Sequence, residues 1–410
     1  MNTKNNLHLF EGFGVELEYM IVDRHTLDVL PASDQILHRV SGAYVNEVEM
    51  GKLAWSNELA LHVIELKTNG PAGSLDNLPE LFQKDIRHIN DILTEIGGKL
   101  MPGGMHPWMN PLTETRLWPH DYNAIYEAYN RIFNCQGHGW SNLQSTHLNL
   151  PFYDDEEFAR LHTAVRLVLP LLPALAASTP VMDGNITGIA DNRLEVYRTN
   201  QKKIPLIAGD VIPEPAYSKT DYERRILLPL YAAIAPYDPE NTLQDEWLNS
   251  RGAIARFERN TIEIRLLDIQ ECPLADIGIL SFIAQIIRAL TQEQLAPVSR
   301  QQSFEVAPLA DIFKKCIIQA EDTLIENIDY LSVFGFKASG PCRAKDLLGH
   351  LADRLVPASG NLSKPIAHIL SHGTLSSRIT RHLGGDSRRE KLKETYDDLC
   401  RCLAEGKLFG

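Results

Sequence analysis

The chain has 410 residues, of which 44% are hydrophobic and 23% are charged, as in an ordinary globular enzyme with a large core. Its formal net charge is −13 and it has no dense run of Lys or Arg, which disfavours binding to nucleic acid or to an anionic membrane. ATP is also an anion, so this acidic chain would need metal ions to bridge it to the protein.

The expected compartment is the cytoplasm. Residues 1–6 lack the apolar segment of a signal peptide, and no run reaches the roughly 18 uninterrupted apolar residues of a membrane helix. The six cysteines include no CxxC pair, which indicates ordinary reduced thiols. We therefore expect a protein that acts on small molecules and binds neither nucleic acid nor a membrane.

The first predicted strand, over 14–22, carries charge where a buried strand should be apolar. Its apolar residues alternate with Glu16 and Glu18, so a period of two places both carboxylates on one face. A second strand over 61–67 carries Glu65. Glu58 precedes Glu65 by seven positions, so a turn or bulge between them is needed to bring both to the same side.

The middle of the chain alternates between helices and strands. The apolar spacing predicts a helix over 78–96 that ends at two glycines, then a short strand over 99–102. A strand over 145–150 places His147 and Asn149 on one face. We further predict helices over 120–133 and 155–177, followed by a long loop over 183–219.

The strand predicted over 261–268 repeats the pattern of the first strand. Ile262, Ile264 and Leu266 share one face, while Glu263 and Arg265 share the other. The remainder is predicted to be helical, over 274–293 and then over most of the chain from 300. This order of elements predicts an α+β protein with a mostly antiparallel sheet and a helical C-terminal part.

Carboxylates on the face of a buried sheet indicate a metal site. They are costly to desolvate unless a cation meets them, and Mg²⁺ is commonly shared between carboxylates and substrate phosphates. Arg265, beside Glu263, is placed to hold a γ-phosphate, and Arg193 in the long loop could clamp a substrate carboxylate. The candidate metal ligands are Glu16, Glu18, Glu58, Glu65, His147 and Glu263.

Five ordered motifs over 14–293 give the chain a family resemblance. It resembles the type-2 glutamate–cysteine ligase or carboxylate–amine ligase family, which has the glutamine synthetase fold. The chain departs from that pattern at Asn149, where the family often has a second histidine, and at Ile186, where an acidic residue is common. The matching segments are 14–18, 64–68, 104–108, 177–193 and 261–268.

The resemblance implies a fold, a domain division and an assembly. The fold is a mostly antiparallel curved sheet that forms a funnel-shaped active site flanked by helices. The catalytic domain covers 1–298, a helical region over 299–410 packs on it, and the protein is a homodimer. The resemblance also implies Mg²⁺ or Mn²⁺ as cofactor and ATP as co-substrate.

The expected reaction joins a carboxylate, with glutamate as the candidate acid, to an amine through an acyl phosphate. Glu263 and Arg265 are the expected catalytic residues, and Arg256 is expected to contact the nucleotide together with Arg265. The acceptor amine is left open. The residues expected to bind substrate are Thr68, His106, Asn149 and Arg193.

Two alternatives to a ligase stay open at this point. A guanidino-type phosphotransferase of the same fold would move phosphate without forming an amide. A catalytically degraded homologue would bind nucleotide, or a partner protein, for regulation.

Overall fold

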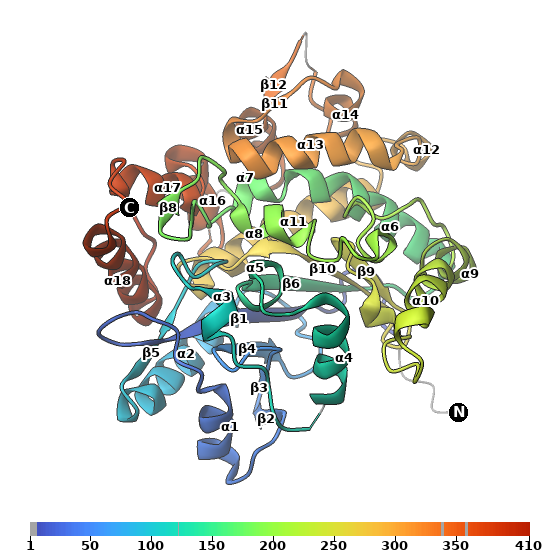
Figure 1. The fold of residues 1–410 in the computed structure, drawn as a ribbon. Coiled ribbons are helices and arrows are strands. Elements are labelled where there is room, and N and C mark those ends of the chain that lie inside the picture. Colours follow the sequence, from blue (N-terminus) through green and yellow to red (C-terminus); the bar gives the residue numbers. More distant parts are fainter. Residues whose placement is uncertain (1–5, 122, 338–339, 357–359) are drawn as a thin grey trace.

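The computed structural model describes residues 6–121, 123–337, 340–356 and 360–410. Residues 1–5, in the amino-terminal segment, and Tyr122, in the helix predicted over 120–133, lie outside these ranges. Within the described residues, one sheet of eight strands runs through the molecule, and helices cover it (Figure 1). The α+β class and the antiparallel sheet are confirmed.

The sheet has the order β2-β3-β4-β1-β6-β10-β9, with β5 paired to the second half of β1. Every pairing in it is antiparallel. Its strands are β1 (Gly14–Asp23), β2 (Glu47–Met50), β3 (Leu53–Asn57), β4 (Val63–Thr68), β5 (Gly98–Met101), β6 (Ser145–Pro151), β9 (Ala253–Arg256) and β10 (Thr261–Asp268).

Two small hairpins lie outside the main sheet. They pair β7 (Val181–Met182) with β8 (Asn185–Ile186), and β11 (Leu324–Ile325) with β12 (Cys342–Arg343). Short 3₁₀ or π segments are η1 (Leu169–Leu171), η2 (Pro205–Ile207), η3 (Glu223–Leu227), η4 (Ala235–Tyr237), η5 (Glu246–Leu248) and η6 (Ala320–Asp322).

The helices fall into two groups along the chain. Those up to residue 291 are α1 (Ser33–Ser41), α2 (Leu78–Glu95), α3 (Pro111–Glu114), α4 (Asn123–Phe133), α5 (His138–Ser141), α6 (Asp155–Val168), α7 (Pro173–Ala176), α8 (Asn192–Tyr197), α9 (Lys219–Tyr222), α10 (Leu228–Ile234) and α11 (Pro273–Thr291). The C-terminal helices are α12 (Val298–Gln301), α13 (Val306–Gln319), α14 (Ile328–Val333), α15 (Ala344–Leu355), α16 (Ser363–His372), α17 (Leu375–Leu383) and α18 (Arg389–Glu405).

The two faces of β1 explain how the sheet sits in the protein. Val15, Leu17 and Tyr19 are fully buried in the main hydrophobic core, which they share with Phe82 and Ile86 of α2. Burying such side chains stabilises the fold by about 1.5–3 kcal/mol each. The other face carries Glu16 and Glu18, so the alternation predicted from the sequence separates core from cavity.

The predicted helix over 155–177 is wrong in its second half. It stops at Val168, passes through η1 and resumes as the short α7. Pro170 and Pro173 lie at this break. They interrupt the helix because proline lacks the N–H that an α-helix needs and clashes with the preceding turn. The loop predicted over 183–219 contains α8, which begins at the Asp191 cap and carries Arg193.

Helix α11 is long and apolar enough to cross a membrane, but it is a core helix here. Of its most apolar 18-residue window, 78% is buried inside the protein. It packs against α2, α6 and α16, so its apolar composition follows from its position at the centre of the molecule.

The C-terminal helices share cores with the rest of the chain. Phe313 and Leu347 belong to the same buried cluster as the central strands, and Tyr396 packs in a second cluster with Met20 of β1. Arg378 of α17 forms a buried ion pair with Glu271. The division at residue 298 stays a prediction.

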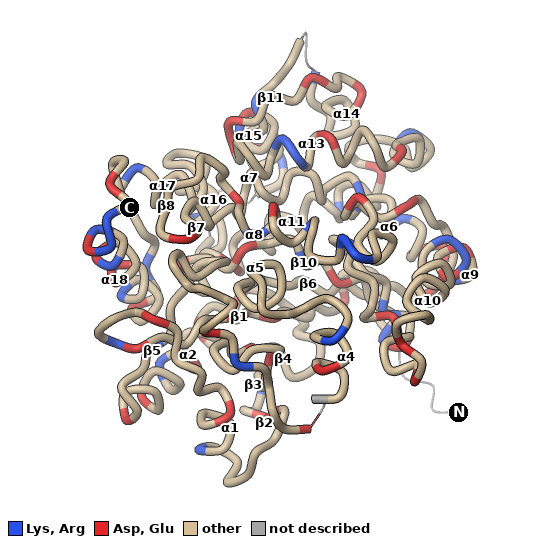
Figure 2. Tube along the Cα trace, viewed as in Figure 1, with Lys and Arg blue, Asp and Glu red and all other residues tan. Residues whose placement is uncertain are grey.

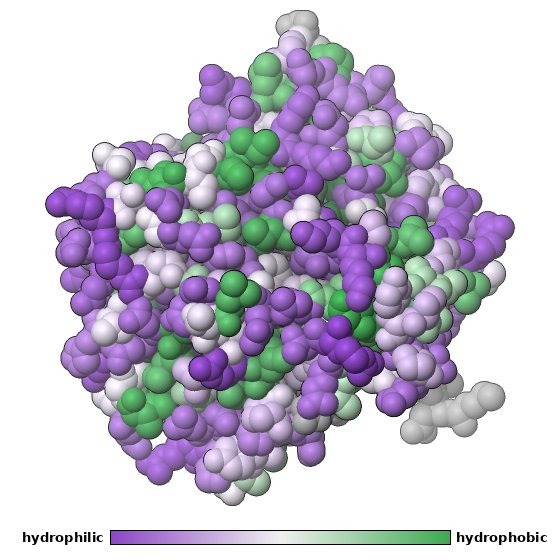
Figure 3. Space-filling view, in the orientation of Figure 1, coloured by the Kyte–Doolittle hydropathy of each residue, from purple (hydrophilic) through white to green (hydrophobic). Residues whose placement is uncertain are grey.

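The surface is mixed in charge and polarity. Acidic and basic residues alternate along outer helices such as α18 (Figure 2). The face seen in Figure 3 is mostly hydrophilic, with separate hydrophobic patches.

Candidate active site

The charged face of the sheet lines a cavity of about 1010 Å³. Strands β1, β4, β6 and β10 each contribute polar side chains to it, so stretches far apart in the sequence converge there. Of the residues predicted to form the site, those that line the cavity are Glu16, Glu18, Glu58, Glu65, Thr68, His147, Asn149, Arg193, Arg256, Glu263 and Arg265.

Glu16 is held by β6, the strand next to it. Its backbone lies opposite His147, which places the imidazole beside the carboxylate. His147 Nδ1 lies 2.7 Å from Glu16 Oε2, and Asn149 Nδ2 donates to Glu16 Oε1 at 3.0 Å. Burial disfavours the charged form of Glu16, but the hydrogen bond and charge of His147 hold its pKa well below the usual range.

Glu18 and Glu65 lie opposite one another on β1 and β4. The backbone N–H of Ser145 donates to Glu18 Oε2 at 2.7 Å, and the Ser145 hydroxyl donates to the same oxygen at 3.0 Å. Glu65 Oε2 accepts a hydrogen bond from the Ser56 hydroxyl, and it forms an ion pair with Lys67 Nζ at 3.1 Å. Burial and the Glu16 charge nevertheless raise the pKa of Glu65 to about 7.

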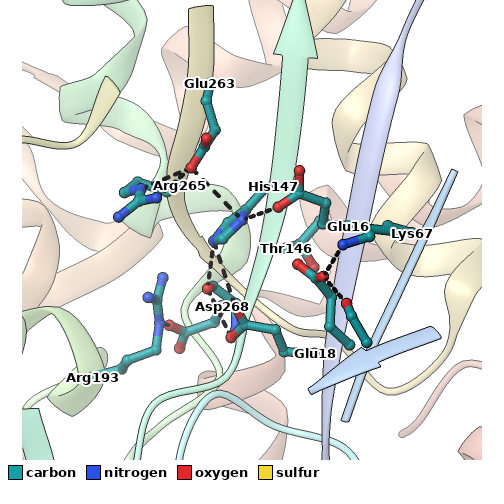
Figure 4. Close-up of polar contacts among 12 residues, drawn as sticks. Glu16, Glu18, Lys67, Thr146, His147, Arg193, Glu263, Arg265 and Asp268 are labelled. Atoms are coloured by element: carbon teal, nitrogen blue, oxygen red, sulfur yellow. Dashed lines mark hydrogen bonds and ion pairs between the residues drawn. The ribbon is translucent and has the colours of Figure 1, made fainter. Parts of the chain in front are cut away.

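His147 stands between these carboxylates (Figure 4). Besides Glu16, its ring lies 3.7 Å from Glu18 Oε1 and 4.0 Å from Glu263 Oε1. Burial lowers the pKa of His147, but the hydrogen bond that its ring donates to Glu16 and the surrounding negative charges raise it to about 9. Only an unprotonated ring nitrogen binds a metal ion, so a cation held here would take the place of a proton on His147.

Two groups of side chains have the spacing of a metal site. The ligand atoms of Glu16, His147 and Glu263 lie within 4.8 Å of one another, and so do those of Glu18, Glu65 and His147. Oxygen donors with one imidazole suit Mg²⁺ or Mn²⁺. The close approach of these donor atoms to one another fits a divalent cation.

Glu58 reaches the cavity from the connection between β3 and β4. Strand β3 ends at Asn57 and β4 begins at Val63, so a turn separates Glu58 from Glu65. This turn is what allows both carboxyl groups to face the same side of the sheet, as the sequence analysis requires. Burial and the nearby charges of Glu18 and Glu65 raise the pKa of Glu58 well above its usual value. Glu58 is not in either group of closely spaced ligand atoms.

Glu263 and Arg265 point to the same side of β10, as the sequence predicts. Arg265 donates to Glu263 Oε1, from Nε at 3.1 Å and also from Nη2. Arg256 of the neighbouring β9 lies 3.7 Å from Glu263 Oε2. Burial opposes ionisation of Glu263, but the Arg265 charge keeps its pKa below the usual value.

Arg193 is anchored by a second acid on β10. Its Nε donates to Asp268 Oδ1, and the side chain is 2% exposed. Asp268 Oδ2 accepts further hydrogen bonds from Ser178 and Thr179. Arg193 Nη2 is buried without a hydrogen-bond partner among the described residues, which leaves one donor of a cavity-lining arginine available.

His106 does not line the cavity, unlike the other predicted substrate residues. It is fully buried, and its Nε2 lies 2.7 Å from the carbonyl oxygen of Leu27. Its ring packs edge-on against Trp108. The Gly-Gly-Met-His-Pro turn thus places this histidine in the interior, and we correct its assignment as a substrate-binding residue.

The sequence analysis missed several residues of the cavity. Lys67 lines the cavity two positions after Glu65, and strand periodicity could have placed it on the same face as Glu65. Tyr126 and Tyr129 also line the cavity; they lie in the helix predicted over 120–133, which was given no role in the site. Trp140 and Trp247 lie on short elements without a periodic pattern, which gave no signal.

The fold is glutamine synthetase-like, as the sequence predicts, and family membership indicates a ligase. The alignment with the solved glutamate–cysteine ligase of Francisella tularensis in complex with AMP covers 97% of this chain and 90% of that chain, with a TM-score of 0.57 and 10% identity. The model of glutamate–cysteine ligase family 2 matches residues 12–312. The chain belongs to this family.

Relatives include proteins matched over nearly all of the chain and others matched over about half. An uncharacterized protein of Archaeoglobus fulgidus is 34% identical over 97% of this chain and 99% of its own length. A relative in Ralstonia pickettii, named for glutamate–cysteine ligase 2, is 30% identical over 94% of this chain and 86% of its own length. One of the same name in Rhodopirellula baltica is 26% identical, and the match spans only 47% of its length.

Proposed function

We propose that the protein is an ATP-dependent carboxylate–amine ligase that forms an amide, with glutamate as its acid, through an acyl phosphate. The observation that carries this proposal is the convergence of four strands on one cavity. There, carboxylates and His147 surround the space where a polyphosphate would sit, and Arg265 lies beside them. Family membership supports the same class of reaction.

Divalent cations held by Glu16, Glu18, Glu65, His147 and Glu263 would neutralise the phosphate charge of ATP. A carboxylate oxygen of the acid attacks the γ-phosphorus, the bond to the β-phosphate oxygen breaks, and ADP leaves. The amine then attacks the acyl carbon, loses a proton and displaces phosphate. Activation is required because a carboxylate is a poor electrophile at neutral pH.

The protein side chains contribute positioning and charge. Arg265 spreads its positive charge over a planar fork beside Glu263, which suits the loose transition state of phosphoryl transfer. Arg193, fixed by Asp268, offers its remaining Nη2 to a carboxylate of the acid. Fixed groups of this kind need no reorganisation during the reaction.

The test is a trapping experiment with hydroxylamine as the amine. Pure protein is incubated with ATP, Mg²⁺, glutamate and hydroxylamine, and both ADP and hydroxamate are measured. We expect the two products in equal amounts, with neither formed when glutamate or Mg²⁺ is omitted. ADP without hydroxamate, together with a phosphorylated acceptor, would identify a phosphotransferase instead. No ADP with any acid in a wide panel would contradict the proposal.

A further inference from the structure

Ser145 lies among the proposed metal ligands, and the proposed reaction gives it no role. It is the first residue of β6 and shares a face of that strand with His147 and Asn149, because side chains two residues apart in a strand point the same way. All three residues line the cavity. Ser145 is buried, so its hydrogen bonds to protein groups decide how its hydroxyl group is oriented.

The pairing of β1 with β6 brings Ser145 to Glu18. The hydrogen-bonded ladder between these strands ends where Leu17 lies opposite Thr146. One residue further along β6, the backbone N–H of Ser145 donates to the Glu18 carboxylate, at 2.7 Å from Oε2. The Ser145 hydroxyl donates to the same oxygen at 3.0 Å. Two hydrogen bonds therefore hold Ser145 and Glu18 in a fixed relation.

The same hydroxyl group also contacts the ring of His147. Its oxygen lies 2.8 Å from Nε2. A serine hydroxyl has one hydrogen to donate, and an ionised carboxylate can only accept. Because the hydrogen of Ser145 is donated to Glu18, the Ser145 oxygen accepts a hydrogen bond from the ring. The hydrogen in this contact therefore belongs to Nε2.

The other ring nitrogen, Nδ1, faces the first group of candidate metal ligands (Figure 4). It lies 2.7 Å from Glu16 Oε2 and 4.0 Å from Glu263 Oε1. Nε2 lies 3.7 Å from Glu18 Oε1, in the second group. Two ligands about 2.1 Å from an ion, on neighbouring corners of an octahedron, are about 3 Å apart. The Nδ1–Glu16 distance is closer to that spacing than the Nε2–Glu18 distance is.

Neighbouring side chains favour a cation at Nδ1 over one at Nε2. Asn149 Nδ2 donates to Glu16 Oε1 at 3.0 Å, which leaves Oε2 turned toward Nδ1. On the other side of the ring, the Ser145 oxygen is held by its bonds to Glu18 and occupies the approach to Nε2. A cation at Nε2 would have to displace that oxygen from the ring.

We propose that Ser145 is a positioning residue for the metal centre: it keeps the hydrogen of the His147 ring on Nε2, so that Nδ1 is the nitrogen that binds a divalent cation. That cation is then the one shared with Glu16 and Glu263, and the second group keeps its two carboxylates without the imidazole. This inference rests on the proposed function and deepens it, because it gives a role to a side chain that binds neither metal nor substrate.

Nuclear magnetic resonance of protein isotope-labelled at the histidine nitrogens reads the ring hydrogens directly. The sample contains Mg²⁺ and a non-hydrolysable ATP analogue, and the His147 signals are identified as those missing from His147→Asn. We expect a hydrogen on Nε2 and none on Nδ1. In a sample that has bound Mg²⁺, a hydrogen on Nδ1, with or without one on Nε2, would overturn the inference.

Ser145→Ala tests the side chain itself, because it removes the hydroxyl group and keeps the backbone N–H that donates to Glu18. We expect the affinity for Mn²⁺, measured by calorimetry with the ATP analogue, to fall about 10- to 100-fold, the usual effect of losing a group that orients a metal ligand. Ser145→Thr restores a hydroxyl group and should recover the affinity. An unchanged affinity in Ser145→Ala, or an equal loss in both variants, would overturn the inference.

Ser56→Ala is the matched control for the ring signals. The Ser56 hydroxyl donates to Glu65 Oε2, so it supports a carboxylate of the second group and not the imidazole. With Mg²⁺ bound, the ring hydrogen of His147 should stay on Nε2 in Ser56→Ala and should no longer be confined to Nε2 in Ser145→Ala. Identical ring signals in the two variants would overturn the inference.

This inference and the proposed function fail in different ways. If the unaltered protein bound neither Mg²⁺ nor Mn²⁺ in the presence of the ATP analogue, the proposed function would be contradicted and the inference with it. If the cation bound while the ring hydrogen stayed on Nδ1, the proposed function would stand and the role of Ser145 would be overturned.

Discussion

Strand β10 supplies the acidic residue of two acid–arginine pairs, and the two pairs have different roles. Asp268 is fully buried, and its oxygens are saturated by Arg193, Ser178 and Thr179. Glu263 also bonds its arginine and lines the cavity, but among the described residues its Oε2 accepts no hydrogen bond, and Arg256 Nη1 lies 3.7 Å from it. A carboxylate oxygen that is left available to a ligand, more than the presence of charge, therefore distinguishes a binding site from a structural ion pair.

The largest effect is expected from breaking the saturated pair. Asp268→Asn would leave Arg193 buried without its counter-charge, which costs about 3–5 kcal/mol when one partner of a buried ion pair is removed. We expect a free energy of unfolding lower by that amount in urea titrations, or no folded protein at all. An unchanged unfolding midpoint would show that the pair is not structural.

Breaking the open pair should remove function and leave the fold. Glu263→Gln takes away a proposed metal ligand that supports no packing, so we expect activity to fall by at least about 100-fold, as for a lost electrostatic group at a reacting centre. The melting temperature of the ligand-free protein should stay close to that of the unaltered chain. Glu49→Gln, on the exposed edge strand β2, is the control and should change neither. A large fall in melting temperature would mean that Glu263 is a structural partner of Arg265.

A smaller effect is expected when the charge at Arg265 is kept but its shape is changed. Arg265→Lys replaces a planar fork with a point charge, so ATP should still bind while phosphoryl transfer slows. We expect kcat to fall about 10- to 100-fold, with a much smaller change in KM for ATP, in steady-state assays of ADP release. An equal rise in KM with unchanged kcat would place Arg265 in ground-state binding alone.

The smallest effect concerns a buried group distant from both pairs. Burial, together with the Arg166 charge, lowers the pKa of His162 to about 3, against 6.5 in the unfolded chain. The unfolded state therefore binds more protons than the folded state below pH 6.5. Protonation of this histidine in the unfolded chain lowers the free energy of unfolding as pH falls. His162→Phe removes that loss, about 2 kcal/mol between pH 7 and pH 5. Urea unfolding of both proteins at the two pH values measures it; an equal pH dependence would contradict the assignment.

The sheet could be predicted from the sequence because its charged residues follow the two-residue period of a strand. Alternation in 14–22 and 261–268 placed Glu16, Glu18, Glu263 and Arg265 on the cavity side, and the structure puts them there. These faces are set by local geometry, which a single strand reveals.

Other parts of the site depend on tertiary contacts that no local pattern encodes. Arg193 and Asp268 are 75 positions apart, and their pairing joins α8 to the end of β10. The cavity lining includes Trp140 and Trp247 from short elements, and His106 is buried by a contact with Leu27 that its turn motif does not show. Proline at 170 and 173 was visible in the sequence, yet the apolar run around it outweighed the break.

The central claim is that distant carboxylates share divalent cations that grip a nucleotide, and Mn²⁺ binding tests it most directly. Electron paramagnetic resonance would count bound Mn²⁺ in the presence of a non-hydrolysable ATP analogue, for the unaltered protein and for Glu263→Gln. We expect tight binding that depends on the analogue and is lost in the variant while its melting temperature is retained. Equal Mn²⁺ binding by both proteins would contradict the account.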